Sequence, residues 1–146
     1  MCVVGHGIRS RFLIIPADPA GGVRTVVIYV RRFRCRRCAT TITVLPAGVR
    51  PRTRHSLGLI VALLCAWSHD EVSTVEVRKL VQPAHFEREW AQPRRWVGWF
   101  LPGAWPPRRR ARRVVEYCAA RAPPASRGLS LKERAVQGAA YVMEMT

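Results

Sequence analysis

The stretch "YVRRFRCRRCATTITVLP", residues 29–46, is the most informative part of this sequence for predicting the fold. Cys35 and Cys38 stand two residues apart among arginines, and residues favoured in β-strands lie on both sides. In a tight turn, two thiolates at this spacing can bind one zinc ion at about 2.3 Å. The neighbouring arginines favour the thiolate form that binds metal. The stretch therefore predicts half of a zinc site between two strands.

Two further β-like segments precede the cysteine pair. The segments 8–15 and 23–34 are rich in β-branched and aromatic residues, and the turn-forming sequence "PADPAGG" at 16–22 lies between them. This pattern predicts a β-hairpin, with a third strand at 40–45. A thioredoxin-like motif would instead open a helix directly after a strand. The N-terminal unit is therefore expected to be zinc-ribbon-like.

Helical patterns replace the β pattern beyond the basic sequence "RPRTRH" at 50–55. An apolar helix is expected at 57–67, too short for the ~20 residues that cross a bilayer. Ser68 and Glu71 fit a capping box, which predicts a second helix through Leu80.

Three more helices are expected in the second half of the chain. The segment 91–101 places Pro93 in a first helical turn, and the segment 108–120 is strongly basic. Ser130 and Glu133 form another capping box for a final helix. The predicted fold class is α+β, with this organisation: a zinc-ribbon-like β unit (1–49), a basic linker (50–55), a helix-turn-helix-like helical domain (56–101) and a basic helical tail (102–146).

The charge balance points to a polyanionic partner. The chain of 146 residues has 25 Lys and Arg against 9 Asp and Glu, which gives a net charge of +16. Such a surface attracts phosphate at long range. A coding bias toward arginine does not explain why acidic residues are so few. Double-stranded DNA in the cytoplasm, at the nucleoid, is the expected partner, and no membrane association is expected.

Residues 3–101 resemble the N-terminal DNA-binding region of insertion-sequence transposases, a zinc ribbon followed by a helix-turn-helix. The sequence "GHGIRSR" at 5–11 matches the stretch after the family's first cysteine knuckle, and "RRFRCRRCATTITVLP" at 31–46 matches its second knuckle. The sequence "RRWVGWF" at 94–100 resembles the arginine–tryptophan pattern of its recognition helix. The resemblance implies a DNA-binding protein related to the targeting region of a transposase, or a truncated or degenerate remnant of one.

The family's first CxxC would lie upstream of Cys2, so the chain as written begins after it. Cys2 and His6, spaced C-x3-H, are the alternative source of two ligands. The expected zinc ligands are then Cys2, His6, Cys35 and Cys38.

The resemblance also implies DNA-contacting residues. Arg94 and Arg95, with Gln92, would lie on the recognition helix, where an arginine can bond guanine O6 and N7. The segment 81–91 is too long for the ~3–4-residue turn of a helix-turn-helix, so a helical turn in "HFERE" (85–89) is a further possibility. The other arginines expected to contact DNA are Arg36, Arg37, Arg50, Arg52, Arg54, Arg108, Arg109 and Arg110.

Several of these residues also have a simpler, structural interpretation. Aromatic residues at helical spacing, such as Trp96 and Trp99, more often form core than stack on bases, and Cys65 and Cys118 are expected to be core thiols. Enzyme activity is not expected, because the resemblance implies that catalysis would need acidic residues holding two metal ions, and the 9 acidic residues of this chain are scattered. A basic RNA-binding protein and a zinc-ribbon module that binds protein remain the alternatives.

Overall fold

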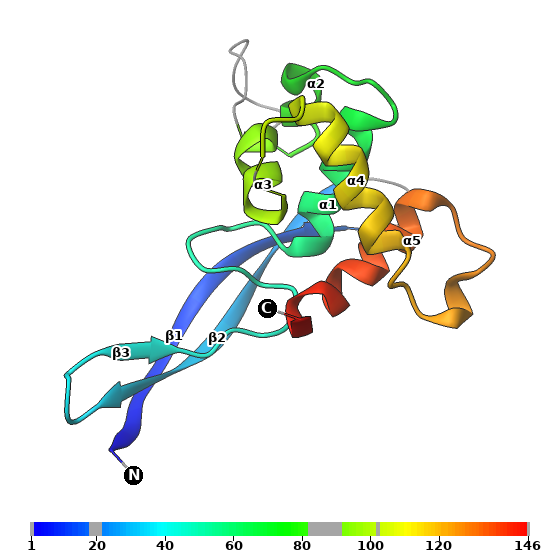
Figure 1. The fold of residues 1–146 in the computed structure, drawn as a ribbon. Helices are drawn as coiled ribbons and strands as arrows, with labels where there is room; N and C mark the ends of the chain where they lie inside the picture. Colours follow the sequence, from blue (N-terminus) through cyan, green and yellow to red (C-terminus); the bar gives the residue numbers. More distant parts are fainter. Residues whose placement is uncertain (1, 18–21, 82–91, 102, 146) are drawn as a thin grey trace.

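A three-stranded antiparallel sheet precedes a helical region, so the chain is α+β (Figure 1). The computed structural model describes residues 2–17, 22–81, 92–101 and 103–145. The elements are β1 (Val3–Pro16), β2 (Val23–Cys35), β3 (Thr41–Thr43), α1 (Leu57–Ser68), α2 (Thr74–Lys79), α3 (Gln92–Phe100), α4 (Pro107–Ala119), η1 (Pro124–Ser126), α5 (Leu131–Gly138) and η2 (Ala139–Met145).

The predicted hairpin is confirmed as a long β1–β2 pair. Its register pairs Phe12 with Val27, and a bulge interrupts it between Gly5 and Ile8. The third strand is shorter than the predicted 40–45, because only Thr41–Thr43 pairs with β2. The end of the hairpin that carries β3 projects away from the helices (Figure 1).

The basic linker holds the other end of the hairpin against the helices. The backbone N–H of Ile14 donates to the carbonyl of Arg54 (2.6 Å), and the N–H of Ser56 donates to the carbonyl of Ile14 (2.9 Å). The Arg11 guanidinium also donates to the carbonyl of Thr53 (2.9 Å). The start of α1 is therefore fixed to β1 by backbone hydrogen bonds.

Helix α1 is the centre of the helical region. Ser56 caps it by accepting a hydrogen bond from the N–H of Leu59, as its place before the apolar run suggests. Every residue of α1 except Gly58 is buried, as expected of a helix that is apolar all round. The segment expected to be a basic tail packs into the same core and contributes Ala111, Val114, Val115, Cys118, Ala119, Ala135 and Ala139.

The capping box predicted at Ser68 and Glu71 is wrong. Ser68 is the last residue of α1, and its hydroxyl donates to the carbonyl of Leu64 (2.6 Å). The box lies five residues later, where Ser73 and Glu76 cap the short helix α2. Both Ser68 and Ser73 are followed by a glutamate three residues later, so the sequence offers two possible capping boxes. Because the apolar helix α1 continues through Ser68, only Ser73 is placed to cap a new helix.

The second predicted capping box, at Ser130 and Glu133, is confirmed at the start of α5. The predicted helix is regular only to Gly138, after which the chain continues as the 3₁₀-helix η2. The helical turn considered in 85–89 lies outside the described residues.

Gly138 marks the closest approach of α5 to α4. A Cβ placed on Gly138 would lie 1.8 Å from the carbonyl oxygen of Cys118, far closer than van der Waals contact allows. Any side chain at this position would therefore push the two helices apart.

Candidate nucleic-acid interface

Helix α3 presents a polar face with an apolar face behind it. Pro93, Trp96 and Val97 are buried against the helical core, whereas Trp99, which was also expected to be core, is exposed. Arg94 and Arg95 are exposed on the other side of the helix, and Gln92 is half-buried at its first turn. The core thus fixes the helix so that two arginines face outward.

The linker brings one further cation to α3. The Arg50 guanidinium lies 5.2 Å from the ring centre of Phe100 and 6.0 Å from that of Trp99. Stacking of an arginine on aromatic faces at these distances is attractive and holds the cation in place. Arg52 and Arg54, the other predicted linker arginines, are exposed. The linker therefore adds the charge of Arg50 to the surface of α3.

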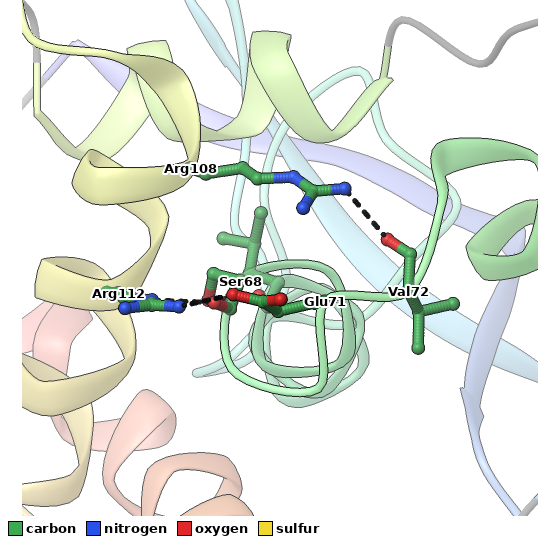
Figure 2. A network of polar contacts seen from close by, with 6 residues as sticks. Ser68, Glu71, Val72, Arg108 and Arg112 are labelled. Carbon is green, nitrogen blue, oxygen red and sulfur yellow. Dashed lines mark hydrogen bonds and ion pairs between the residues drawn. The ribbon is translucent and has the colours of Figure 1, made fainter.

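The predicted arginine run on α4 divides into two sets. Three members donate hydrogen bonds to backbone carbonyls of neighbouring segments. Arg110 donates to Leu101 (3.0 Å) after α3, Arg112 to Ser68 (2.6 Å) at the end of α1, and Arg108 to Val72 (3.4 Å). Figure 2 shows the side chains of Arg108 and Arg112 extending from α4 toward Val72 and Ser68.

The binding of Arg112 explains how α1 ends. Helix α1 has no basic residue in its last turn, where carbonyl oxygens concentrate negative charge. Arg112 supplies that cation from α4 and also pairs with Glu71 (3.2 Å). Glu71 adopts a left-handed backbone conformation, with φ at 55°. These contacts give Arg108, Arg110 and Arg112 a structural role that the sequence did not suggest.

The remaining arginines of the run lie over an aromatic ring. Arg109 and Arg113 lie 4.6 Å and 5.8 Å from the ring centre of Trp105. Among the described residues, neither forms a hydrogen bond or an ion pair. Trp105 was expected to lie in the core or to stack on bases, and the sequence alone did not link it to Arg109 and Arg113, although the spacing of four residues was visible.

The cysteine knuckle lies at the far end of the hairpin. The Sγ atoms of Cys2 and Cys35 are 3.6 Å apart, and the N–H of Arg36 donates to the carbonyl of Cys2 (2.7 Å). Two sulfurs at ~2.3 Å from one tetrahedral zinc would be about 3.8 Å apart, so this pair is spaced for a shared metal.

Backbone donors favour the thiolate of Cys35. Hydrogen bonds from the backbone and thiol of Cys38, and from the backbone of Arg37, lower the pKa of the Cys35 thiol. The described residues nevertheless contain no group of three or more His, Cys, Asp or Glu side chains arranged for a metal ion. The predicted set of Cys2, His6, Cys35 and Cys38 is therefore not assembled here.

The two basic regions of the prediction lie apart. Arg36 and Arg37 are exposed beside the knuckle, on the hairpin end that projects away from α3 (Figure 1). The structure thus brings Arg50 to α3 but leaves the knuckle arginines at a separate place.

The comparisons with known proteins give no assignment. No protein-family model, curated protein or solved structure matches the chain. Within the described ranges, no helix is long and apolar enough to cross a membrane.

Proposed function

We propose that this chain binds double-stranded DNA and is related to the targeting region of insertion-sequence transposases. In this proposal α3 is the recognition helix, and Arg94 and Arg95 contact base edges in the major groove. The protein acts as a binding module without catalysis of its own, in the cytoplasm at the nucleoid.

The exposed polar face of α3 is the observation that carries the proposal. A recognition helix needs an apolar side docked on a rigid core and an exposed polar side that faces the groove. Trp96 and Val97 supply the first, and Arg94 and Arg95 supply the second. Gly98, on the outer side, has open space around its Cα, which allows a close approach of the helix to DNA.

The linker and the knuckle supply phosphate contacts in this proposal. Arg50 is held on the rings of Trp99 and Phe100, at the edge of α3. Arg36 and Arg37 would reach phosphates further along the duplex, because the hairpin extends away from the helices. Such contacts position a protein on DNA and carry no sequence information themselves.

Salt dependence of duplex binding tests the proposal. Binding of a labelled random-sequence duplex should weaken steeply with salt, with a log–log slope of about 0.9 for each phosphate contact. Replacing both Arg36 and Arg37 with Ala should remove up to two phosphate contacts and so lower the slope by up to about 1.8. The control replaces Arg108 and Arg110, which bind backbone carbonyls, and should change the slope less.

Two outcomes would point to the alternative functions. Structured RNA that competes better than duplex DNA at equal phosphate concentration would indicate an RNA-binding protein. Duplex binding that is weak and nearly independent of salt would indicate a module that binds protein. Either result would overturn the proposal.

A further inference from the structure

We propose that the outward side of α4 binds an unpaired polynucleotide strand, whose bases stack on Trp105 and Tyr117 while its phosphates contact Arg109 and Arg113. This α4 stripe consists of Trp105, Arg109, Arg113, Tyr117 and Arg121. The site is separate from α3, and the inference does not require α3 to bind duplex DNA.

The stripe follows a spacing of four residues. With 3.6 residues in a turn, each such step rises about 6 Å and rotates about 40° around the helix axis. Arg109, Arg113 and Tyr117 therefore follow one slowly turning line on the side of α4 that faces away from its buried residues. Trp105 and Arg121 extend this line just beyond the two ends of the helix.

The two rings of the stripe are both exposed and both associated with cations. Trp105 remains 49% exposed although two guanidinium groups lie over its ring. Tyr117 remains 41% exposed, with the Arg121 guanidinium 3.3 Å from its ring centre. Arg121 also donates to the carbonyl of Tyr117 (3.3 Å), so it holds the ring rather than projecting into solvent.

The other arginines of α4 show what is unusual about the stripe. Arg108, Arg110 and Arg112 are engaged with backbone carbonyls of neighbouring segments. Arg109 and Arg113, by contrast, have charged groups that no described carboxylate or carbonyl binds. A cation that is held over an exposed ring, and that no described carboxylate pairs with, is suited to bind a phosphate beside a stacked base.

The chemistry favours an unpaired strand over other polyanions. Proteins that bind single strands combine cations along the backbone with aromatic rings on which bases stack. Bases in a duplex are already stacked on one another, so exposed rings on a helix side do not reach their faces. An acidic protein surface would use the arginines and leave Trp105 and Tyr117 without a partner.

Fluorescence anisotropy of a labelled oligothymidylate of about a dozen nucleotides tests the proposal. Trp105→Ala and Tyr117→Ala should each weaken binding at least about fivefold, the loss expected for one stacked base. Trp105→Phe should restore most of the affinity, because a ring remains. Tyr29→Ala is the matched control, since Tyr29 is an exposed aromatic residue on β2, and it should bind as the unaltered protein does.

Charge changes give a second, independent readout. The ring variants should keep the salt slope, whereas the double variant of Arg109 and Arg113 to Ala should lower it by about 0.7 for each lost contact. Glu116 is exposed next to Tyr117, so Glu116→Gln should strengthen binding. A parallel titration with oligouridylate tells whether DNA or RNA is preferred, and tight binding of either one that depends on Trp105 supports the proposal.

Unchanged oligonucleotide affinity in both ring variants, with folding verified by circular dichroism, would overturn the proposal. So would displacement of the oligonucleotide by polyglutamate at equal charge, because that would identify an acidic protein surface as the partner. Failure of duplex recognition is a separate result: replacing Arg94 and Arg95 should impair duplex binding and leave oligothymidylate binding intact.

Discussion

Single residues fix the close contacts of this structure, and Gly138 is the clearest example. Its missing side chain lets α5 approach the backbone of α4, where the carbonyl of Cys118 occupies the space of a Cβ. Gly98, in α3, has open space at the same position. Two helical glycines of one chain therefore have opposite roles, and only the structure distinguishes them.

Gly138→Ala should lower the free energy of unfolding by at least the ~1–3 kcal/mol typical of an overpacked site. Gly98→Ala should leave it unchanged or raise it by up to ~1 kcal/mol, because alanine is the better helix former. Urea unfolding of both variants measures the difference. Equal stability of the two variants would mean that α5 does not cross α4 as described.

His55 should make stability depend on pH. Burial lowers the pKa of His55. Its ring packs edge-on against that of Trp96, with the two ring centres 5.3 Å apart. The unfolded chain then binds a proton more readily than the folded one, so stability should fall as the pH drops below about 6.5. The free energy of unfolding at pH 7.5 and 5.5 should differ less in His55→Gln. The same pH dependence in the variant would contradict this account.

The thiols at the end of the hairpin are predicted to bind zinc. Cys2 and Cys35 have the required separation, and Cys38 and His6 would have to join them, because the structure does not bring the four together. The purified protein should carry one zinc per chain by elemental analysis, and Cys35→Ser should abolish it. Cys65→Ser, at a buried core thiol, should retain the metal. Wild-type protein that is fully folded without zinc would contradict the prediction.

At the scale of elements, the arginines of α4 link this helix to neighbouring segments by hydrogen bonds to their backbone carbonyls. Its buried side packs on α1 and α5, while Arg112 neutralises the carbonyl end of α1 (Figure 2). A basic run read from sequence alone suggests phosphate contacts along its whole length. Here alternate residues of the run have different roles, because they point to different sides of the helix.

Arg112→Ala should destabilise the protein by about 1 kcal/mol, since it removes a charge-assisted hydrogen bond to the carbonyl of Ser68. The Glu71 pair adds little, because both side chains are substantially exposed. Arg113→Ala is the matched control and should alter stability by less than ~0.5 kcal/mol. Thermal and urea unfolding compare the two. A larger loss in Arg113→Ala would reverse the roles assigned here.

At the scale of the whole molecule, the sequence predicted the elements better than their packing. The hairpin, the central helix and the cap at Ser130 followed from local patterns that tertiary contacts did not override. The capping box predicted at Ser68 was wrong because the apolar run of α1 extends to this residue. Its hydroxyl therefore bonds to the carbonyl of Leu64 within α1 and caps no new helix. The α4 stripe required knowledge of which arginines reach α1 and α3, which depends on packing between distant segments.

The central claim is that α3 reads DNA sequence, and selection of bound duplexes from a random-sequence pool tests it most directly. The unaltered protein should enrich a sequence motif, because base contacts specify while phosphate contacts position. The double variant of Arg94 and Arg95 to Ala should lose that enrichment. The double variant of Arg36 and Arg37 to Ala should keep the motif with weaker binding overall. An unchanged motif after loss of Arg94 and Arg95 would contradict the claim.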